Sequence, residues 1–174
     1  MHIDNYVGII MTPEELSREL RLGSARFLQL RRKTLGLSLL AAGTMMPIAL
    51  YQMGIIRHLP EVPLPRLNAD AVDASREAYA ILATPDAVLG LVSFSVTAWL
   101  AAAGGEDRVQ SQRWIPIALA GKVAIDMVNG VRLSIDQWTK HREFCSWCLV
   151  AAGASIATVP FVVPEARAAI RGKG

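Results

Sequence analysis

The sequence predicts an all-α integral membrane protein, a bundle of four transmembrane helices with an amphipathic cytoplasmic helix at its N-terminus. Of the 174 residues, 52% are hydrophobic and 19% are charged, which is more apolar than a typical soluble domain. The apolar residues are concentrated in long blocks rather than spread with the period of a soluble helix or strand. This composition argues against a disordered or nucleic-acid-binding tail. We therefore expect a lipid bilayer as a partner, and no nucleic acid.

The first predicted element is the N-terminal amphipathic helix. Thr12, Pro13 and Glu15 supply an N-cap, a first-turn proline and a capping-box acid for a helix that continues toward Lys33. Its apolar residues fall near one face, which is typical of a helix lying on the inner membrane surface or against the bundle, although a helix that docks a partner would show the same pattern. We assign residues 1–33 to this cytoplasmic segment, 34–166 to the membrane domain and 167–174 to a basic cytoplasmic tail.

The four predicted spans are apolar blocks close to the roughly 20 residues that a helix needs to cross a bilayer. Three of them contain no charged residue: 35–56, 87–105 and 144–164. The fourth, 114–131, carries Lys122 and Asp126, which lie one helical turn apart and can pair while facing other helices. Small residues within the spans are expected to allow close helix approach, namely Gly43, Gly90, Gly121 and Gly153.

The topology follows from the distribution of positive charge. With a cytoplasmic N-terminus, eleven Lys and Arg residues lie in inner segments and six in outer segments, so both termini are predicted to be cytoplasmic in a multi-pass protein of the cell inner membrane. The first apolar block starts only at Leu35 and is longer than the apolar region of a signal peptide, so we expect it to stay in the protein. The outer segment after it, with Pro60, Pro63 and Pro65, is the natural cap for a site on the outer face.

The two cysteines, Cys145 and Cys148, are the main candidates for chemistry. They form a CxxC motif at the start of the last span. On a helix, positions i and i+3 face the same way, and the helix N-terminus favours the thiolate of the first cysteine. The predicted topology places the pair at the outer face, where disulfides can form. The motif therefore predicts a redox-active pair of catalytic cysteines.

Other uses of a CxxC motif can be weighed against this one. Haem attachment requires His after the second cysteine, where this chain has Leu149. A structural zinc site needs four ligands, and His141 with the two cysteines supplies three, so we predict no metal. A static disulfide would close too small a loop to constrain the unfolded chain much. Metal binding and a structural disulfide nevertheless remain alternatives.

Taken together, the four spans, the outer loop after the first and the sequence Phe144-Cys145-Ser146-Trp147-Cys148 resemble the vitamin K epoxide reductase family of membrane thiol and quinone oxidoreductases. The resemblance runs from about residue 35 to 164. A second similarity is Thr-Pro-Asp-Ala-Val-Leu-Gly at residues 84–90, which resembles the Pro-Asn-Ala-Leu-Leu-Gly type of sequence in bacterial members.

The resemblance implies that Cys145 and Cys148 exchange electrons with a quinone of the ubiquinone or menaquinone type, with Cys148 facing the quinone. Asp86 falls where family members often have an Asn that hydrogen-bonds the quinone oxygen. In the family, a second cysteine pair in the outer loop relays electrons to or from a thioredoxin-like partner. Residues 58–84 contain no cysteine, and Ala152 stands where many animal members have a tyrosine. Either a separate thioredoxin-like extracytoplasmic protein reaches Cys145 directly, or turnover has been lost.

Three other residues are candidates for quinone contact. Lys122 and Asp126 are candidates to bind a quinone oxygen or carry a proton, and equally to form a structural ion pair. Trp147 lies between the cysteines and is a candidate to border a flat aromatic ligand. We predict a membrane thiol–disulfide oxidoreductase that couples the CxxC pair to quinone and supports disulfide formation in extracytoplasmic proteins. The alternative is a non-catalytic scaffold or metal-binding protein that retains the bundle.

Overall fold

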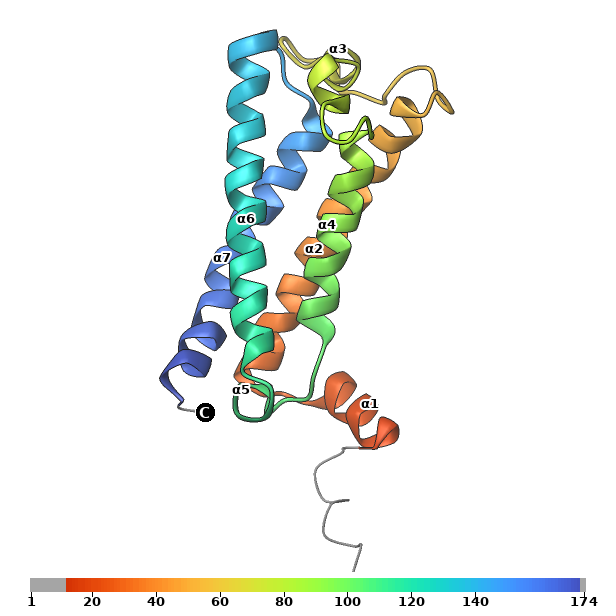
Figure 1. The fold of residues 1–174 in the computed structure, drawn as a ribbon. Helices are drawn as coiled ribbons and strands as arrows, with labels where there is room; N and C mark the ends of the chain where they lie inside the picture. The colour runs from red at the N-terminus through yellow and green to blue at the C-terminus, as the bar shows by residue number, and fades with distance from the viewer. Residues whose placement is uncertain (1–11, 173–174) are drawn as a thin grey trace, which may run out of the picture.

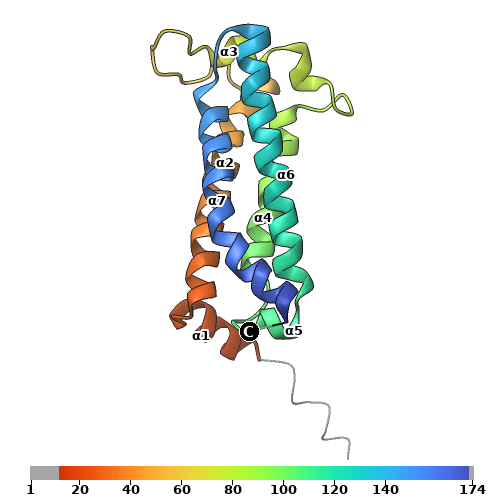
Figure 2. The ribbon, with the colours of Figure 1, turned by 90° about the vertical axis from the view of Figure 1, so that its left-hand side faces the viewer.

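The computed structural model describes residues 12–172, and over that range the chain is helical without a β-strand. The long helices run alongside one another (Figures 1 and 2); they are α2 (Arg26–Gln52), α4 (Asp86–Ala102), α6 (Trp114–Asp136) and α7 (Ser146–Arg171). The short helix α3 (Ala69–Asp73) lies at one end of the bundle, and α1 (Pro13–Leu22) and α5 (Arg108–Ser111) lie at the other. We call these the α3 end and the α5 end.

Three helices in the described residues are long and apolar enough to cross a membrane: α2, α7 and the continuous helix Trp114–His141 that contains α6. The helix α4 is apolar but has only 17 residues. The all-helical prediction and the membrane character are therefore confirmed, and the number of four spans stays a prediction. The helix bounds differ from the predicted blocks, because α2 begins before Leu35 and α7 continues through Pro160 and Pro164 into the predicted tail.

The N-terminal capping box is confirmed, but the helix is shorter than predicted. The Thr12 hydroxyl accepts a hydrogen bond from the Glu15 amide at 3.2 Å, and the Glu15 carboxylate accepts one from the Thr12 amide at 2.9 Å. The prediction of a helix continuing toward Lys33 is wrong, since α1 ends at Leu22 and α2 begins at Arg26. A Cβ at Gly23 would lie 2.5 Å from the Glu19 carbonyl oxygen, so glycine permits the tight turn between the two helices.

The connection between α2 and α4, residues 53–85, folds over the beginning of α7. It contains α3 and the 3₁₀ helix η1 (Arg76–Tyr79). The amide of Asn68 donates to the carbonyl of Phe144 at 2.9 Å, and the amide of Phe144 donates to the carbonyl of Arg66 at 2.8 Å. Phe144 comes just before α7, after α6 has passed through the π-helical segment η2 (Gln137–His141). These two backbone hydrogen bonds hold α3 beside the CxxC motif.

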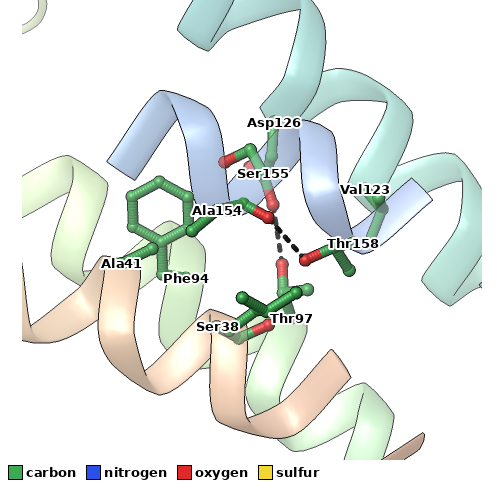
Figure 3. A pocket seen from close by; sticks show the side chains of 10 residues that line it. Ser38, Ala41, Phe94, Thr97, Val123, Asp126, Ala154, Ser155 and Thr158 are labelled. Carbon is green, nitrogen blue, oxygen red and sulfur yellow. Dashed lines mark hydrogen bonds between the residues drawn. The ribbon is translucent and has the colours of Figure 1, made fainter. Parts of the chain in front are cut away.

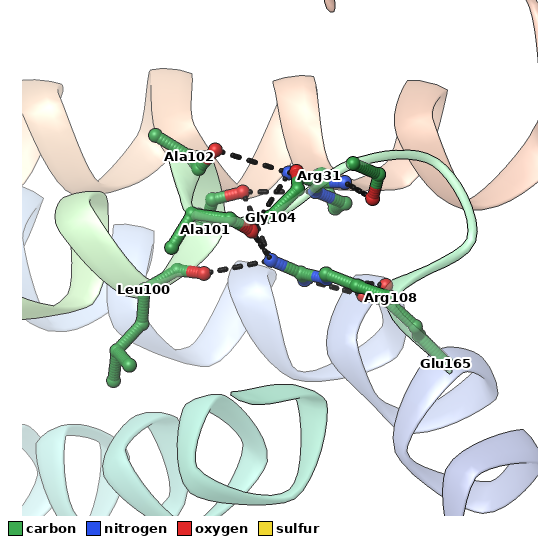
Figure 4. A network of polar contacts seen from close by, with 9 residues as sticks. Arg31, Leu100, Ala101, Ala102, Gly104, Arg108 and Glu165 are labelled. Atoms are coloured by element: carbon green, nitrogen blue, oxygen red, sulfur yellow. Dashed lines mark hydrogen bonds and ion pairs between the residues drawn. The ribbon is translucent and has the colours of Figure 1, made fainter. Parts of the chain in front are cut away.

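At the α5 end, two buried arginines hold the C-terminus of α4 (Figure 4). Arg31 donates to carbonyl oxygens from Ala101 to Gly105 at the end of α4 and in the following turn. Arg108 donates to the carbonyl oxygens of Leu100 and Ala103 and forms a bidentate ion pair with Glu165 of α7. The carbonyl groups that a helix C-terminus leaves without intrahelical partners are thereby satisfied by side chains.

Close helix approach depends on two glycines, only one of which is among those predicted. A Cβ at Gly90 of α4 would lie 2.8 Å from the Met45 sulfur of α2, and a Cβ at Gly130 of α6 would lie 3.2 Å from the Ala152 Cα of α7. The prediction of close approach is wrong at the other three positions, where a Cβ would meet no described atom within 4 Å: Gly43, Gly121 and Gly153.

Candidate active site at the CxxC motif

The two cysteines form the first turn of α7. Cys145 is the N-cap residue and is completely buried, while Cys148 is half-buried, and both are free thiols in this structure. The Cys145 sulfur accepts a hydrogen bond from the Cys148 amide at 3.3 Å. A sulfur in this position satisfies an amide that the helix start would otherwise leave free, and negative charge there is favoured by the helix dipole. The Cys145 sulfur therefore caps the start of α7, one helical turn from the Cys148 sulfur.

Asp73, at the end of α3, is a member of the site that the sequence analysis missed. Its side chain is 3% exposed, and the Cys148 thiol donates to its Oδ1 at 3.6 Å. A carboxylate oxygen of Asp73 and the sulfurs of Cys145 and Cys148 all lie within 4.8 Å of one another. The one sequence signal was spacing, because Ala69, Val72 and Asp73 are at i, i+3 and i+4 and form the buried face of α3.

The surroundings of Asp73 favour its neutral form. Burial raises the pKa of its carboxyl to about 6, and the nearby negative charges of Asp86 and Glu61 act in the same direction. The thiols of Cys145 and Cys148 oppose this shift by hydrogen bonding to the carboxyl. Oδ2 of Asp73 is buried and has no hydrogen-bond partner among the described residues. The site thus contains an acid that titrates close to neutral pH beside the cysteine pair.

Asp86 lies at the same end of the bundle and is linked to Asp73 through Gln52. The Gln52 amide donates to Oδ1 of Asp86 at 2.7 Å and to the backbone carbonyl of Asp73 at 3.2 Å. The Gln52 side-chain oxygen accepts from the Ala87 amide at 3.2 Å, which fixes the start of α4 against the end of α2. The structure therefore brings the predicted residue Asp86 to the cysteine end of the molecule.

Trp147 holds the proline-rich stretch over the start of α7. Its indole N–H donates to the carbonyl of Pro60 at 2.8 Å, and the Ser146 amide beside it donates to Glu61 at 3.3 Å. Its ring packs against the same apolar cluster that contains Cys145. Trp147 is thus part of the wall around the cysteines, and its contact with a flat aromatic ligand stays a prediction.

Lys122 and Asp126 form a separate polar cluster deeper in the bundle, and Figure 3 shows Asp126 of this cluster beside Thr97. Asp126 is buried, pairs with Lys122, and accepts hydrogen bonds from Ser93 at 2.9 Å and Thr97 at 2.7 Å. It lines a cavity of about 10 Å³ between the four long helices, which is about the space needed for one water molecule. Ser155, also in that lining, is two helical turns beyond Cys148. The predicted quinone contacts therefore lie in two places: Asp86 and Trp147 are near the cysteines, whereas Lys122 and Asp126 are deeper in the bundle.

The comparison with protein families identifies the chain. The model of the vitamin K epoxide reductase family matches residues 33–163. The chain belongs to the vitamin K epoxide reductase family. No curated protein and no solved structure matches it. The resemblance noted in the sequence is therefore confirmed, and family membership indicates a membrane oxidoreductase that acts on thiols and quinones.

The residues around the cysteines fit the quinone that the vitamin K epoxide reductase family implies. The apolar cluster at the α3 end includes Met45 and Ile48, with Leu91 and Phe94 packed against it, and such side chains suit the faces of a quinone ring. The free Oδ2 of Asp73 is a polar group with unused hydrogen-bonding capacity. The cavity in the bundle has room for a water but not for a ring, so a quinone would enter only as side chains move apart.

The geometry does not support zinc binding through His141. His141 lies in η2 and is not part of the cluster formed by Asp73, Cys145 and Cys148. Within residues 12–172, no fourth histidine, cysteine or acidic ligand joins these three, whereas a structural zinc site uses four. The site is therefore better described as a thiol pair with an adjacent acid.

Proposed function

We propose that this member of the vitamin K epoxide reductase family couples the Cys145–Cys148 pair to a quinone of the ubiquinone or menaquinone type and supports disulfide formation in extracytoplasmic proteins. The observation that carries the proposal is the placement of both thiols in the first turn of α7, with one sulfur accepting the amide of the other cysteine. A pair so arranged can form a disulfide within one helical turn, and its potential depends on the surrounding helix and acids.

The proposed reaction begins with the oxidised pair. A thiolate of the partner attacks the Cys145 sulfur, the Cys145–Cys148 bond breaks and Cys148 leaves as a thiolate. The partner's second thiol then attacks the mixed disulfide, so the partner carries the new disulfide and both cysteines are reduced. Bound quinone accepts two electrons. For each turnover, Cys145 and Cys148 give up two electrons and two protons and return to the disulfide.

Access to Cys145 requires the connection between α2 and α4 to open. Cys145 is completely buried beneath this connection, which is held by the Trp147 bond to Pro60 and the backbone bonds between Asn68 and Phe144. A partner's sulfur must come within bonding distance of the Cys145 sulfur. The partner that we propose is a separate thioredoxin-like extracytoplasmic protein, since residues 58–84 contain no cysteine to act as a relay.

We also propose the topology that this chemistry needs. The helix α4 is the fourth span beside α2, α6 and α7, both termini are cytoplasmic, and the CxxC motif faces the outer side of the cell inner membrane. Residues 1–33 form the cytoplasmic segment, 34–166 the membrane domain and 167–174 the tail. The excess of Lys and Arg at the α5 end supports this orientation, and the apolar sequence of α4 supports its place in the membrane.

The test is quinone-dependent formation of the disulfide in the purified full-length protein. The protein is reduced, freed of reductant and mixed with a short-chain ubiquinone or menaquinone, and the remaining thiols are trapped by alkylation. We expect rapid loss of both thiols in the wild type and in the matched control Ser146→Ala. Cys145→Ser and Cys148→Ser should each abolish turnover of a reduced thioredoxin-like substrate while the helix content is unchanged. Full turnover in Cys148→Ser would refute the role of the cysteine pair, and thiols that ignore both quinones would favour the non-catalytic scaffold.

A further inference from the structure

The fold alone does not explain why the carboxyl of Asp73 is buried without a cation in the part of the chain that the structure describes. Asp73 is 3% exposed at the end of α3, and no lysine, arginine or histidine is hydrogen-bonded to its carboxyl in the described residues. Buried carboxyls are ordinarily paired with a cation or fully hydrogen-bonded, because an unpaired buried charge is costly. Here one oxygen faces the Cys148 thiol at 3.6 Å and the other has no partner. Such an arrangement is better suited to exchanging a proton than to holding the fold together.

The groups around Asp73 are acids and thiols. Asp86 faces it from the start of α4, Glu61 from the proline-rich stretch, and Cys145 and Cys148 from the first turn of α7. Burial in the presence of these groups raises the pKa of the Asp73 carboxyl to about 6. A general acid or base is most effective when its pKa is near the working pH, so Asp73 is poised to accept and release a proton at neutral pH.

We propose that Asp73 is the catalytic base and acid of the cysteine pair, taking the proton of the Cys148 thiol when the pair is oxidised and supplying a proton to Cys148 when the pair is reduced. This inference rests on the proposed function. During oxidation, the S–H bond of Cys148 breaks and its proton moves to Oδ1 of Asp73. The bond between the two sulfurs then forms as Cys145 also loses its proton, the two electrons pass to the quinone, and two protons complete the quinol, one from Asp73 and one matching the proton released by Cys145.

The reverse direction of proton transfer belongs to the other half of the cycle. When a partner thiolate opens the Cys145–Cys148 disulfide, Cys148 leaves as a thiolate next to Asp73. Asp73, after taking up a proton that the partner's dithiol releases, donates it to the leaving sulfur and becomes a carboxylate, which is the form that the next oxidation requires. One carboxyl therefore serves both halves of the reaction, and Asp73 gains and loses a proton once in each half.

The test compares Asp73→Asn with wild type and with Glu77→Gln, an exposed acid in η1 of the same connection. The rate of disulfide formation with a short-chain ubiquinone is measured from pH 5 to pH 9. In the wild type the rate should rise with pH through about 6, because only the carboxylate form of Asp73 accepts a proton. Asp73→Asn should be slower by about 100-fold at pH 7, within the usual range for losing a general base, and should lack this rise. Glu77→Gln should keep the wild-type rate and profile.

A second measurement separates a chemical role from a purely structural one. In a Cys145→Ser background, the alkylation rate of Cys148 is measured without quinone. Replacing Asp73 by Asn removes a negative charge beside the Cys148 thiol, and this loss of charge favours the Cys148 thiolate. Alkylation of Cys148 in the Cys145→Ser background should therefore become faster. Quinone-dependent oxidation, measured with Cys145 intact, should become slower. A purely structural defect would instead change both rates in the same direction, set by whether the thiol becomes more or less exposed. It would also leave the pH profile unchanged.

The outcomes distinguish this inference from the proposed function. If wild type is oxidised by quinone and Asp73→Asn matches its rate and pH profile, Asp73 is not the base, and the proposed function stands. If wild type itself ignores quinone, the proposed function fails and the role of Asp73 fails with it. If Asp73→Asn does not fold, Asp73→Glu decides: it retains a titrating carboxyl, so a preserved rise with pH supports the inference and a flat profile overturns it.

Discussion

The ion pair between Arg108 and Glu165 anchors the helix that carries the cysteines, and its removal gives a large, measurable loss of stability. The Arg108 side chain is completely buried and Glu165 is 3% exposed. Two hydrogen bonds of 2.7 Å join them in a bidentate arrangement, which is the strongest geometry for this pair. Because Glu165 belongs to α7 and Arg108 to α5, the pair fixes the far end of α7 against the turn between α4 and α6.

The expected magnitude can be estimated in two ways. Breaking a buried ion pair by removing one partner costs about 3–5 kcal/mol. Two hydrogen bonds to charged groups, at about 1.5–3 kcal/mol each, give a similar value. In Glu165→Ala the guanidinium of Arg108 also remains close to Arg31, since both donate to the carbonyl of Ala101. We therefore expect Glu165→Ala to lower the free energy of unfolding by about 4 kcal/mol.

The assay is equilibrium unfolding in mixed detergent micelles with rising SDS content, followed by circular dichroism. The matched control is Asp136→Ala, which removes an ion pair to Lys140 whose side chains are 31% and 44% exposed. Exposed pairs contribute little, so the control should lose less than about 1 kcal/mol. The double variant Arg108→Met/Glu165→Leu should recover only part of the loss, because the carbonyl of Leu100 then lacks its donor. A loss in Glu165→Ala no larger than in the control would refute the reasoning.

Two further predictions concern the packing between the long helices, and both use the same unfolding assay. Lys122→Met leaves the buried Asp126 carboxylate without its cation, so the free energy of unfolding should fall by about 3 kcal/mol. Most of this loss should be recovered in Lys122→Met/Asp126→Leu. A free energy of unfolding in Lys122→Met equal to that of wild type would contradict this prediction. Gly130→Ala forces a Cβ within 3.2 Å of the Ala152 Cα, whereas Gly153→Ala meets no described atom within 4 Å. Both changes gain the same helix propensity, so Gly130→Ala should be the less stable by about 1–3 kcal/mol, and equal stabilities would show that the helices have room to separate.

The features predicted correctly from the sequence are those encoded locally. A block of apolar residues near the length of a membrane span predicts a helix wherever it stands, and all four predicted blocks fall largely within α2, α4, α6 and α7. The capping box at Thr12 and Glu15 is a contact over three residues, and it is present as predicted. The position of Cys145 at the start of α7 follows from the same local pattern.

The features that were missed depend on contacts between distant residues. Asp73 meets Cys148 across 75 positions of the chain, and Arg31 meets the end of α4 across about 70. Nothing in the residues around Asp73 marks it as a neighbour of the cysteines, because its place is set by backbone hydrogen bonds between Asn68 and Phe144. The break at Gly23 was missed for a different, local reason. The capping box marks the start of a helix, and a single glycine without proline does not determine where the helix ends.

The chemistry of Asp73 bears on how electrons reach this protein. In the arrangement that the family resemblance implies, cysteines of the outer loop pass electrons to the CxxC pair, and thiols can carry both electrons and protons. Here the connection between α2 and α4 places a carboxyl against the pair and contains no cysteine. A carboxyl accepts and donates protons but does not undergo thiol exchange. Under the proposed function, electrons therefore pass from the partner directly to Cys145 when the connection opens, and in the role that we propose Asp73 handles the proton at Cys148. This division of roles requires that a partner dithiol be sufficient for reduction, without any cysteine in the connection.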